Sequence, residues 1–448
     1  MPRRTLPFLC VLCIAGCETT QVADRDASAP VDQSIAEDAS GDMATCAYRN
    51  TNCPLSAPIC SSSTDQCRPC VDPADETACA NRSDGHPHCG STGACVECRT
   101  DADCPIGNPV CDTNQTCRPC VSTGDCPDSV CILTGARAGQ CAFGGTEVAW
   151  VDNTNMTLCM NGNGLKPSSP YCDIDKAIIN LGLPYIHVAG STIPYPAVTQ
   201  LHASTTNIGP LQISGPGIGA SPSARVFTVG ADSFGISSTG AGSVSIVLEG
   251  LEMGGDSTSK GRYGLEVANA GTGNIDVTVT GCLIHDNYYG GVNLPGPTNY
   301  VIVNTFIVRN GDLTMAGPAV QLGNAATGVF AFNTVAENLS AGILSGIDCG
   351  ASPKTIEGSI VTMNGSVGGG GMLGPTCNAL NIVLAGVDFV STTDFHLDIS
   401  SPSSQAANAA CCIDKITSDP GTPLKNVDVN GTIRPKGNGW DIGAHEVQ

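Results

Sequence analysis

The sequence predicts an all-β protein in which a solenoid of stacked parallel strands, a parallel β-helix, follows a small disulfide-rich repeat region. Cysteine usage is the first observation, since sixteen of the 26 cysteines lie between residues 46 and 141. The second is a series of short apolar, strand-like runs after residue 146, which return with a period in the twenties. The third is composition: 54 glycines and only 4% aromatic residues are typical of many short strands and tight turns.

Composition also excludes several classes of protein. Hydrophobic residues make up 41% of the chain and charged residues 14%, which is too apolar for a disordered protein. The formal net charge of -21 argues against nucleic acid as a partner. Twenty-six cysteines indicate export to an oxidising compartment.

The first residues have the pattern of an export signal. Arg3 and Arg4 form a positive region, and residues 6–15 form an apolar stretch that is too short to span a bilayer. Residues 14–17 (IAGC) resemble the bacterial lipobox, which implies a signal peptide of residues 1–16 and lipidation of Cys17. The chain would then meet a membrane through this lipid anchor. Glu18 favours the outer membrane, so we expect a lipoprotein of the cell envelope that is exposed at the surface.

Residues 17–45 are acidic and have no hydrophobic period, and we interpret them as a lipidated, disordered tether. The repeat region follows at residues 46–141, where four sets of four cysteines start 22 to 28 residues apart. A unit of that size cannot be stabilised by a hydrophobic core, so disulfides must do it. Spacing does not choose among the three pairings that four cysteines allow. The cysteines are Cys46, Cys53, Cys60, Cys67, Cys70, Cys79, Cys89, Cys95, Cys98, Cys104, Cys111, Cys117, Cys120, Cys126, Cys131 and Cys141.

Zinc is the alternative for these cysteines, because C-x2-C pairs have the spacing of zinc ligands. These pairs straddle the repeat boundaries, however, and few histidines accompany them. They are Cys67/Cys70, Cys95/Cys98 and Cys117/Cys120. Residues 98–117 resemble the short Cys-rich repeats of large envelope proteins in some soil bacteria, which implies a spacer or an adhesive module.

One helix is predicted, over residues 173–182 (DIDKAIINLG). Its apolar residues share one face, Asp173 is a suitable N-cap and Gly182 a suitable stop. We expect it to cover the open N-terminal end of the coils, since a bare end would offer free strand edges. Cys159 and Cys172 are expected to pair just before it.

Four later runs share a local motif: VTGCLIHDN, IVNTFIVRN, AFNTVAEN and IEGSIVTMN. We place its anchor at Gly281, Asn304, Asn333 and Gly358, with steps of 23, 29 and 25 residues. Each run ends in asparagine, which tolerates the left-handed conformation at turns. Stacked coils would join these amides in a hydrogen-bonded ladder, and the alternative is four ordinary turn residues. The ladder residues are Asn287, Asn310, Asn338 and Asn364.

With this pattern the chain resembles the pectin-lyase-like right-handed parallel β-helices, which implies that fold for residues 142–400. Residues 428–446 and 395–404 resemble the ending called choice-of-anchor Q, which implies that residues 401–448 close the last coils. This chain reads SPSSQAANA where that ending usually has SPAIDAG. Within it, Arg434 is expected to pair with Asp441 or Glu446.

Five further cysteines remain in the β-helix and the closing segment. Cys282 lies among apolar neighbours and is predicted to be a buried free thiol. Cys349 and Cys377 are about one coil apart, so they pair with each other or each pairs with one member of the Cys411–Cys412 dipeptide.

A column of charged residues is the candidate catalytic site. Asp286, Arg309 and Glu337 each precede a ladder asparagine, so we expect them to stack about 4.8 Å apart and face solvent. Polysaccharide-cleaving enzymes of this fold place carboxylates, basic residues and often calcium on one outer face, so the column would be an acid/base or calcium site. The alternative is a solvated turn of alternating charge, with Met363 in the fourth position. Asp286 and Glu337 would lie roughly 10 Å apart, at or beyond the separation that glycoside hydrolysis uses.

Sugar binding is the neighbouring hypothesis, since the outer faces of a long β-helix suit extended glycans. Tyr263, Tyr288, Tyr289 and Tyr300 form the one aromatic cluster of the coil region, with turn packing as the alternative role. We therefore expect a non-enzymatic adhesion or glycan-interaction scaffold, whose partner is a polysaccharide or another cell-surface component. The alternative is a polysaccharide lyase or glycoside hydrolase acting on an extended glycan along the β-helix face. No cofactor is expected, and calcium is the ion that a carboxylate column would take.

Overall fold

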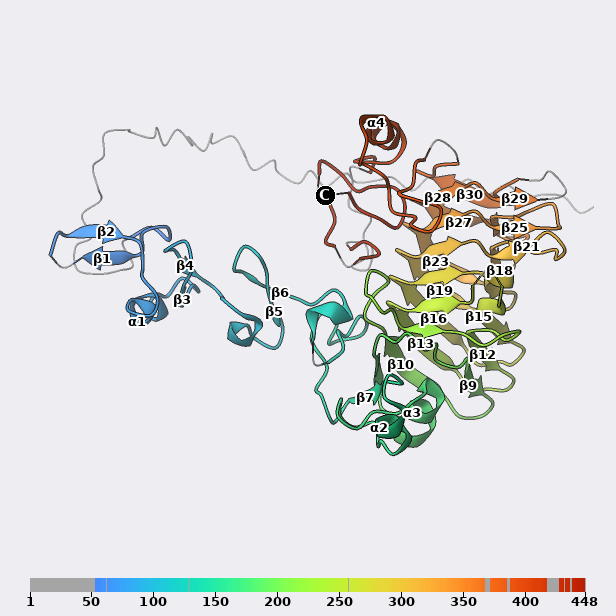
Figure 1. Cartoon of the computed structure of the whole chain (residues 1–448), viewed down its shortest axis with the longest axis horizontal. Coiled ribbons are helices and arrows are strands. Elements are labelled where there is room, and N and C mark those ends of the chain that lie inside the picture. Colours follow the sequence, from blue (N-terminus) through green and yellow to red (C-terminus); the bar gives the residue numbers. More distant parts are fainter. Residues whose placement is uncertain are drawn as a thin grey trace, which may run out of the picture.

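The computed structural model describes residues 53–447 except 62, 128, 257, 367–370, 385–386, 417–426, 431 and 436. The predicted signal peptide, Cys17, the tether and Cys46 therefore lie outside the described residues. Within them the chain is mostly strands, which form long stacked parallel sheets preceded by disulfide-rich units (Figure 1). The predicted all-β class, a parallel β-helix behind a disulfide-rich repeat region, is confirmed.

The Cys-rich units are small hairpins and single helical turns that extend away from the β-helix as an arm (Figure 1). Their elements are β1 (Ile59–Ser61), β2 (Gln66–Arg68), α1 (Glu76–Ala80), β3 (His88–Cys89), β4 (Cys95–Val96), η2 (Asp101–Asp103), β5 (Val110–Cys111), β6 (Cys117–Arg118) and η3 (Thr123–Asp125). The described disulfides join the first cysteine of a set to the third, and the second to the fourth. They are Cys53–Cys67, Cys70–Cys89, Cys79–Cys95, Cys98–Cys111, Cys104–Cys117, Cys120–Cys131 and Cys126–Cys141.

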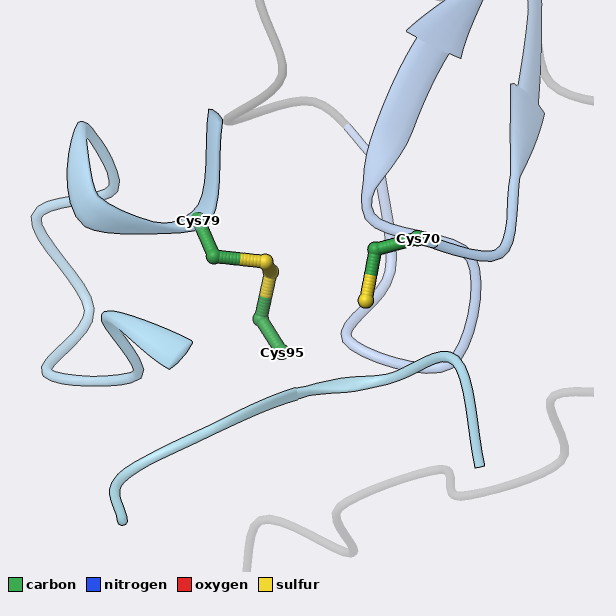
Figure 2. A group of neighbouring side chains, drawn as sticks. All are labelled: Cys70, Cys79 and Cys95. Carbon is green, nitrogen blue, oxygen red and sulfur yellow. A yellow bond between two sulfur atoms is a disulfide. The ribbon is translucent and has the colours of Figure 1, made fainter. Parts of the chain in front are cut away.

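Cysteine sulfurs gather in the second, third and fourth units without forming a zinc site. The sulfurs of Cys70, Cys79 and Cys95 lie within 4.8 Å of one another (Figure 2). Cys79 and Cys95 are bonded to each other and Cys70 to Cys89, so two crossing disulfides bring the sulfurs together. Zinc is bound by thiolates, and every described cysteine of the repeat region is instead disulfide-bonded.

Three parallel sheets and one short one form the walls of the β-helix. Sheet 1 contains β7 (Val148–Val151), β8 (Tyr185–Val188), β10 (Ile208–Ser214), β13 (Val244–Glu249), β16 (Ile275–Thr280), β19 (Asn299–Val303), β23 (Thr327–Ala331), β27 (Lys354–Glu357) and β30 (Cys377–Leu380). Sheet 2 contains β11 (Arg225–Val226), β14 (Glu252–Gly254), β17 (Leu283–His285), β20 (Phe306–Val308), β24 (Thr334–Ala336) and β28 (Ile360–Thr362). Sheet 3 contains β9 (Val198–Ala203), β12 (Phe234–Ser238), β15 (Gly261–Asn269), β18 (Asn287–Leu294), β22 (Val320–Leu322) and β26 (Ile347–Asp348). The short sheet contains β21 (Gly311–Asp312), β25 (Leu339–Ser340) and β29 (Gly365–Ser366).

The interior is a continuous apolar stack because equivalent residues of successive coils pair in register. Leu265, Val292, Val320 and Ile347 are paired one after another across sheet 3, and each is fully buried. Alternate side chains point to opposite faces of a strand, so each inward residue leaves an outward neighbour on the surface of the sheet. This alternation decides which side chains a ligand on the outside can meet.

Sharp turns in the left-handed conformation join sheet 1 to sheet 2. They are made by Gly250, Gly281, Asn304, Phe332, Gly358 and Asn381, with positive φ angles between 51° and 61°. The predicted anchor at Asn333 is wrong by one residue, because Phe332 occupies the turn. Asn333 points inward instead, where its Oδ1 accepts a hydrogen bond from the Thr305 N–H at 3.0 Å. Asparagine suits both positions, so matching residue types misplaced the anchor.

The N-terminal end of the coils is closed by two devices. The helix α3 (Ile174–Leu181) has Asp173 as N-cap and Gly182 in the left-handed conformation, and it buries Ile174 and Ala177 against the first coils. It follows α2 (Met156–Met160) and the Cys159–Cys172 disulfide. The free edge of β7 is paired by the chain around residue 171, where Tyr171 bridges to Val151.

The fourth Cys-rich unit packs directly on the first coils of the β-helix. Val130, Ile132 and Ala142 form one buried cluster with Val148 and Trp150 of β7. This contact makes the last unit of the arm part of the same body as the coils.

Buried polar side chains fix the same junction. The buried Glu249 carboxylate of β13 accepts hydrogen bonds of 2.7 Å from both the backbone N–H and the hydroxyl of Thr123. Gln212 of β10 donates to the Cys131 carbonyl at 2.7 Å and accepts from the Leu133 N–H at 3.2 Å.

The C-terminal segment lies along the corner between sheets 1 and 2. It contains α4 (Pro402–Cys411), and Ile416 and Ile442 pack in one cluster with Phe332 and Ile360 of the coils. Arg434 forms an ion pair with Glu446 at 3.5 Å, and its guanidinium donates to the backbone carbonyls of Asp441 and Gly443. Of the two expected partners, Glu446 therefore supplies the carboxylate.

The remaining cysteines follow one of the pairings that the sequence left open. Cys349 is bonded to Cys377, and Cys411 is bonded to its neighbour Cys412. Cys282 is a free, buried thiol, as predicted. Burial raises its pKa to about 12, so it stays protonated at neutral pH. No helix among the described residues is long and apolar enough to cross a membrane.

Candidate ligand-binding face

The four asparagines that end the coil motif form a hydrogen-bonded ladder. The Nδ2 of Asn287 donates to Oδ1 of Asn310 at 2.9 Å, Asn310 to Asn338 at 3.1 Å, and Asn338 to Asn364 at 2.9 Å. The same oxygens also accept the backbone N–H groups of Asn287, Asn310 and Asn338. The ladder fixes the register of the turns that follow the strands of sheet 2, and it positions the residues on either side.

The predicted charged column occupies these turns, with the left-handed conformation at Asp286, Arg309, Glu337 and Met363. Only the first two are in contact: the Arg309 guanidinium lies 3.1 Å from Oδ2 of Asp286. Asp286 does not face solvent, since its side chain is 13% exposed. Among the described residues Glu337 makes no such contact, so three residues do not form one site.

His285, which precedes Asp286 in the sequence, links it to a further carboxylate. His285 lies between Oε1 of Glu252 at 2.9 Å and Oδ2 of Asp286 at 2.8 Å. Burial favours neutral His285, but the hydrogen bonds to the two carboxylates outweigh it and raise the pKa of the imidazole. Desolvation is likewise outweighed at Glu252 and Asp286, whose pKa values are lowered by the cationic His285. Sequence analysis could have found Glu252, because this residue lies in the coil motif that follows Gly250.

The C-terminal segment covers this network. Arg309 donates to the Thr392 carbonyl at 3.4 Å, and its guanidinium lies 5.4 Å from the centre of the Phe395 ring. Phe395 in turn packs against Phe306 of sheet 2. None of the main hollows in the described part of the chain is lined by Glu252, His285, Asp286, Arg309 or Glu337. The arrangement is that of a packed charge network beneath a strap.

The outer face of sheet 3 presents a different arrangement, with aromatic rings at one side. The rings of Tyr263 and Tyr289 have centres 5.7 Å apart, and Tyr288 meets Tyr289 edge-on at 5.4 Å. Tyr300 was grouped with them on sequence, which is wrong: it lies in sheet 1, is 2% exposed and belongs to the core. Three half-buried tyrosines therefore share one surface.

A row of polar side chains crosses the same face. Glu266, Asn293, Gln321 and Asp348 are paired one to the next across β15, β18, β22 and β26, so successive residues lie about 4.8 Å apart. They alternate with the buried Leu265, Val292, Val320 and Ile347 and therefore point outward. Sequence periodicity alone did not reveal this row, because its members differ in residue type and successive members lie 27 or 28 residues apart.

A carboxyl pair with one arginine stands where the row meets the tyrosines. Asp232 and Glu266 are in hydrogen-bond contact, and Arg262 lies 3.6 Å from Asp232 and 3.5 Å from Glu266. Burial, followed by the neighbouring Glu266, raises the pKa of Asp232 to about 7. Arg262 also lies over the Tyr289 ring at 5.8 Å.

The hollow between α3 and β10 lacks such chemistry. Its volume is about 470 Å³, and it is lined mainly by apolar side chains such as Ile178, Leu183 and Leu211, with no titratable residue. The outer face of sheet 3 instead combines aromatic rings, amides and charges. Comparison of the chain with protein families, with curated proteins and with solved structures finds no match.

Proposed function

We propose that this protein is a surface lipoprotein that binds an extended glycan on the outer face of sheet 3 without cleaving it. The observation that carries the proposal is the straight row of Glu266, Asn293, Gln321 and Asp348 beside the three tyrosines. Polar groups repeating about every 4.8 Å suit a chain of sugar units, which presents hydroxyl groups at a similar repeat. Tyrosines add apolar rings and polar tips, which suit both faces of a sugar.

In this proposal the Cys-rich units are a spacer. Cys17 would carry the lipid, residues 18–45 would act as the tether, and the disulfide arm would hold the binding face away from the outer membrane. The described arm supports this, because its units succeed one another along a line and only the fourth packs on the coils (Figure 1).

A glycan array with the purified whole chain tests the binding proposal. The whole chain is used because the fourth unit packs on the first coils. We expect specific binding of extended glycans, and this binding should be lost in the Tyr289→Ala variant. It should be retained in the Tyr171→Ala variant, because the Tyr171 ring lies near α3 instead. Absence of any glycan binding would contradict the proposal.

Polysaccharide cleavage is the alternative function, and the Glu252–His285–Asp286 network is the observation that favours it. Its cover by Thr392 and Phe395 stands against it, since a substrate would have to displace the C-terminal segment. A reducing-end release assay on the glycans that bind decides between the two. Turnover that is lost in His285→Ala would establish the enzyme, and binding without release would support the scaffold.

A further inference from the structure

We infer that two residues paired across each Cys-rich hairpin dock that unit on the next one, and that the joint between the second and third units is a hinge controlled by a histidine. A joint is the contact between one Cys-rich unit and the unit that follows it along the arm (Figure 1). The arm would have this hinge whatever ligand sheet 3 binds. The paired residues are Ile59 and Arg68, His88 and Val96, and Val110 and Arg118.

An apolar member of the pair packs on the next unit at the first and third joints. Ile59 of the first hairpin is buried in a cluster with the disulfide-bonded cysteines of the second unit. Val110 of the third hairpin is buried in the same way among cysteines of the fourth unit. The crossing disulfides of a unit therefore form an apolar platform for the preceding hairpin.

An arginine of the pair completes the same two joints. The Arg68 guanidinium donates to both carboxylate oxygens of Asp75, at 2.6 and 2.8 Å. Arg118 makes the same contact with Asp125, at 3.1 and 2.9 Å. Both aspartates stand five residues after the first cysteine of their unit, so the position of the acceptor repeats. Bidentate contacts of this kind are directional, and they orient one unit on the next.

The second joint carries its pair in the reverse order. His88 occupies the position that is apolar at the other two joints, and the buried Val96 occupies the position of the arginines. The equivalent aspartate is Asp103, whose Oδ1 lies 3.8 Å from Nε2 of His88. The cation of this joint thus comes from the other strand of the hairpin, and it is a histidine.

The fourth unit shows that the pair matches the surface that receives it. The equivalent residues are Val130 and Ala142, which are joined by a backbone hydrogen bond of 2.8 Å. Both are buried in one cluster with Val148 and Trp150 of β7. Where the receiving surface is an apolar strand, both members of the pair are apolar.

His88 lies in a network of three carboxylates and one guanidinium. Its Nδ1 lies 2.7 Å from Oε1 of Glu76 in α1. Arg99 of the third unit lies 3.2 Å from the same oxygen and 2.9 Å from Asp72. With a neutral imidazole the network, including Asp103, has three negative charges and one positive charge. Protonation of His88 adds a second positive charge and so strengthens the contact between the units.

The two carboxylates beside His88 stay ionised. The Arg99 N–H contributes most to lowering the pKa of Asp103, against the effect of burial. Burial opposes ionisation of Glu76, but hydrogen bonds from the Cys89 N–H and from His88 outweigh it and lower the pKa. Histidine side chains change their charge between about pH 5 and pH 8. The ion pair with Asp103 is therefore present in mildly acidic solution and is lost as the pH rises, whereas arginine keeps its charge at the other two joints.

Small-angle X-ray scattering of the purified whole chain at about pH 5 and about pH 8 tests the hinge. We expect the ratio of bent to straight arms to rise about two- to fivefold at the higher pH, which is the effect of losing one exposed ion pair. His86→Ala is the matched control, because His86 belongs to the same unit and lies beside Asp84 instead. This variant should respond to pH as the native chain does.

Exchanging the pairs should move the hinge. The double variant His88→Ile/Val96→Arg has the order of the first and third joints, and the introduced arginine would meet Asp103. Its arm should no longer respond to pH. The double variant Ile59→His/Arg68→Val places the reversed pair at the first joint and should respond to pH more strongly than the native chain. Mass spectrometry of the disulfides checks that both variants fold.

Four outcomes decide the matter. An arm whose shape does not change with pH in the native chain overturns the hinge, and so does a response that survives in His88→Ile/Val96→Arg. An unaltered response in Ile59→His/Arg68→Val overturns the role of the hairpin pair. If a double variant does not form its disulfides, His88→Gln replaces it, since glutamine is neutral at both pH values. Its arm should be as bent at pH 5 as at pH 8, and a response like that of the native chain overturns the inference.

Discussion

Single residues of this protein reach their roles through neighbours on other coils. His285 is the clearest case, since its two carboxylate partners are Asp286, next in sequence, and Glu252, one coil earlier. The imidazole is 7% exposed, and its hydrogen bonds to both carboxylates raise its pKa. The partner that lies 33 residues away is the one that sequence analysis passed over.

Replacing His285 by alanine should lower the free energy of unfolding by about 2–3 kcal/mol, because two half-buried carboxylates lose their shared cation. Urea denaturation followed by circular dichroism measures this. The double variant Glu252→Gln/His285→Ala should recover part of the loss, and His202→Ala, at an exposed position, should cost less than either. Unchanged stability of His285→Ala would show that the network contributes nothing.

Asp232 predicts a pH dependence of stability. Its pKa of about 7 in the folded protein lies above the unfolded value of about 3.9, so the folded state binds more protons between these values. The contribution of protonated Asp232 is fully present below the unfolded pKa and is lost as the pH rises through about 7.

Melting temperatures measured across this range check the prediction. The native chain should lose more stability than Asp232→Asn, in which the group no longer titrates. Parallel pH profiles for the two proteins would assign the pH dependence to other groups.

Turns and ladders are the elements that set the register of the coils. The asparagine ladder joins four turns, and each shared oxygen serves both a side chain and a backbone N–H of the preceding turn. Its stability depends on burial as well as on hydrogen bonds. Asn310 is fully buried and Asn364 is half-buried.

Asn310→Leu should therefore lower the free energy of unfolding by about 2–3 kcal/mol, since the Asn287 N–H is left buried without an acceptor. Asn364→Leu should cost less, because water can replace the lost amide there. Chemical denaturation of both variants gives the comparison. Equal losses would mean that burial does not decide the contribution of a ladder position.

The turn at Met363 should be improved by glycine. Its φ is 55° and its side chain is 53% exposed, so the left-handed strain is not offset by burial. Met363→Gly should raise the free energy of unfolding by about 0.5–1 kcal/mol. Met160→Gly is the matched control: this methionine is 68% exposed but helical, so the same change should destabilise the protein. Destabilisation of both would contradict the assignment of strain to Met363.

At the scale of the whole molecule, the arm and the β-helix share one buried junction. Gln212 and Glu249 reach from the wall of sheet 1 to the backbone of the fourth Cys-rich unit. In the proposed function this junction would matter, since a loose joint would let the proposed binding face turn back toward the membrane.

Gln212→Ala should loosen the junction without unfolding the coils, because it removes the hydrogen bonds to Cys131 and Leu133. Limited trypsin digestion should then cut after Arg137 about tenfold faster than in the native chain. Gln200→Ala, on the exposed face of β9, serves as the control and should leave the rate unchanged. Unaltered cleavage in Gln212→Ala would show that the apolar cluster alone fixes the junction.

Local sequence determined the features whose sequence patterns repeat along the chain or involve residues close together in sequence. The period in the twenties, the asparagine that ends each motif and the caps of α3 were readable because each depends on backbone conformation within a few residues. Cys282 was recognisable as a free thiol from its apolar neighbours. These features follow from the chain itself, whatever lies across from it.

Tertiary structure alone decided what lies beside what. It placed Phe332, and not the predicted Asn333, at the turn, and it selected the disulfide pairings. It placed Tyr300 in the core and brought Glu252 into contact with His285. It also assembled the row of Glu266, Asn293, Gln321 and Asp348, whose members have no common residue type. The physical reason is that such contacts are set by register between coils, and a shift of one residue turns every side chain of a strand to the opposite face.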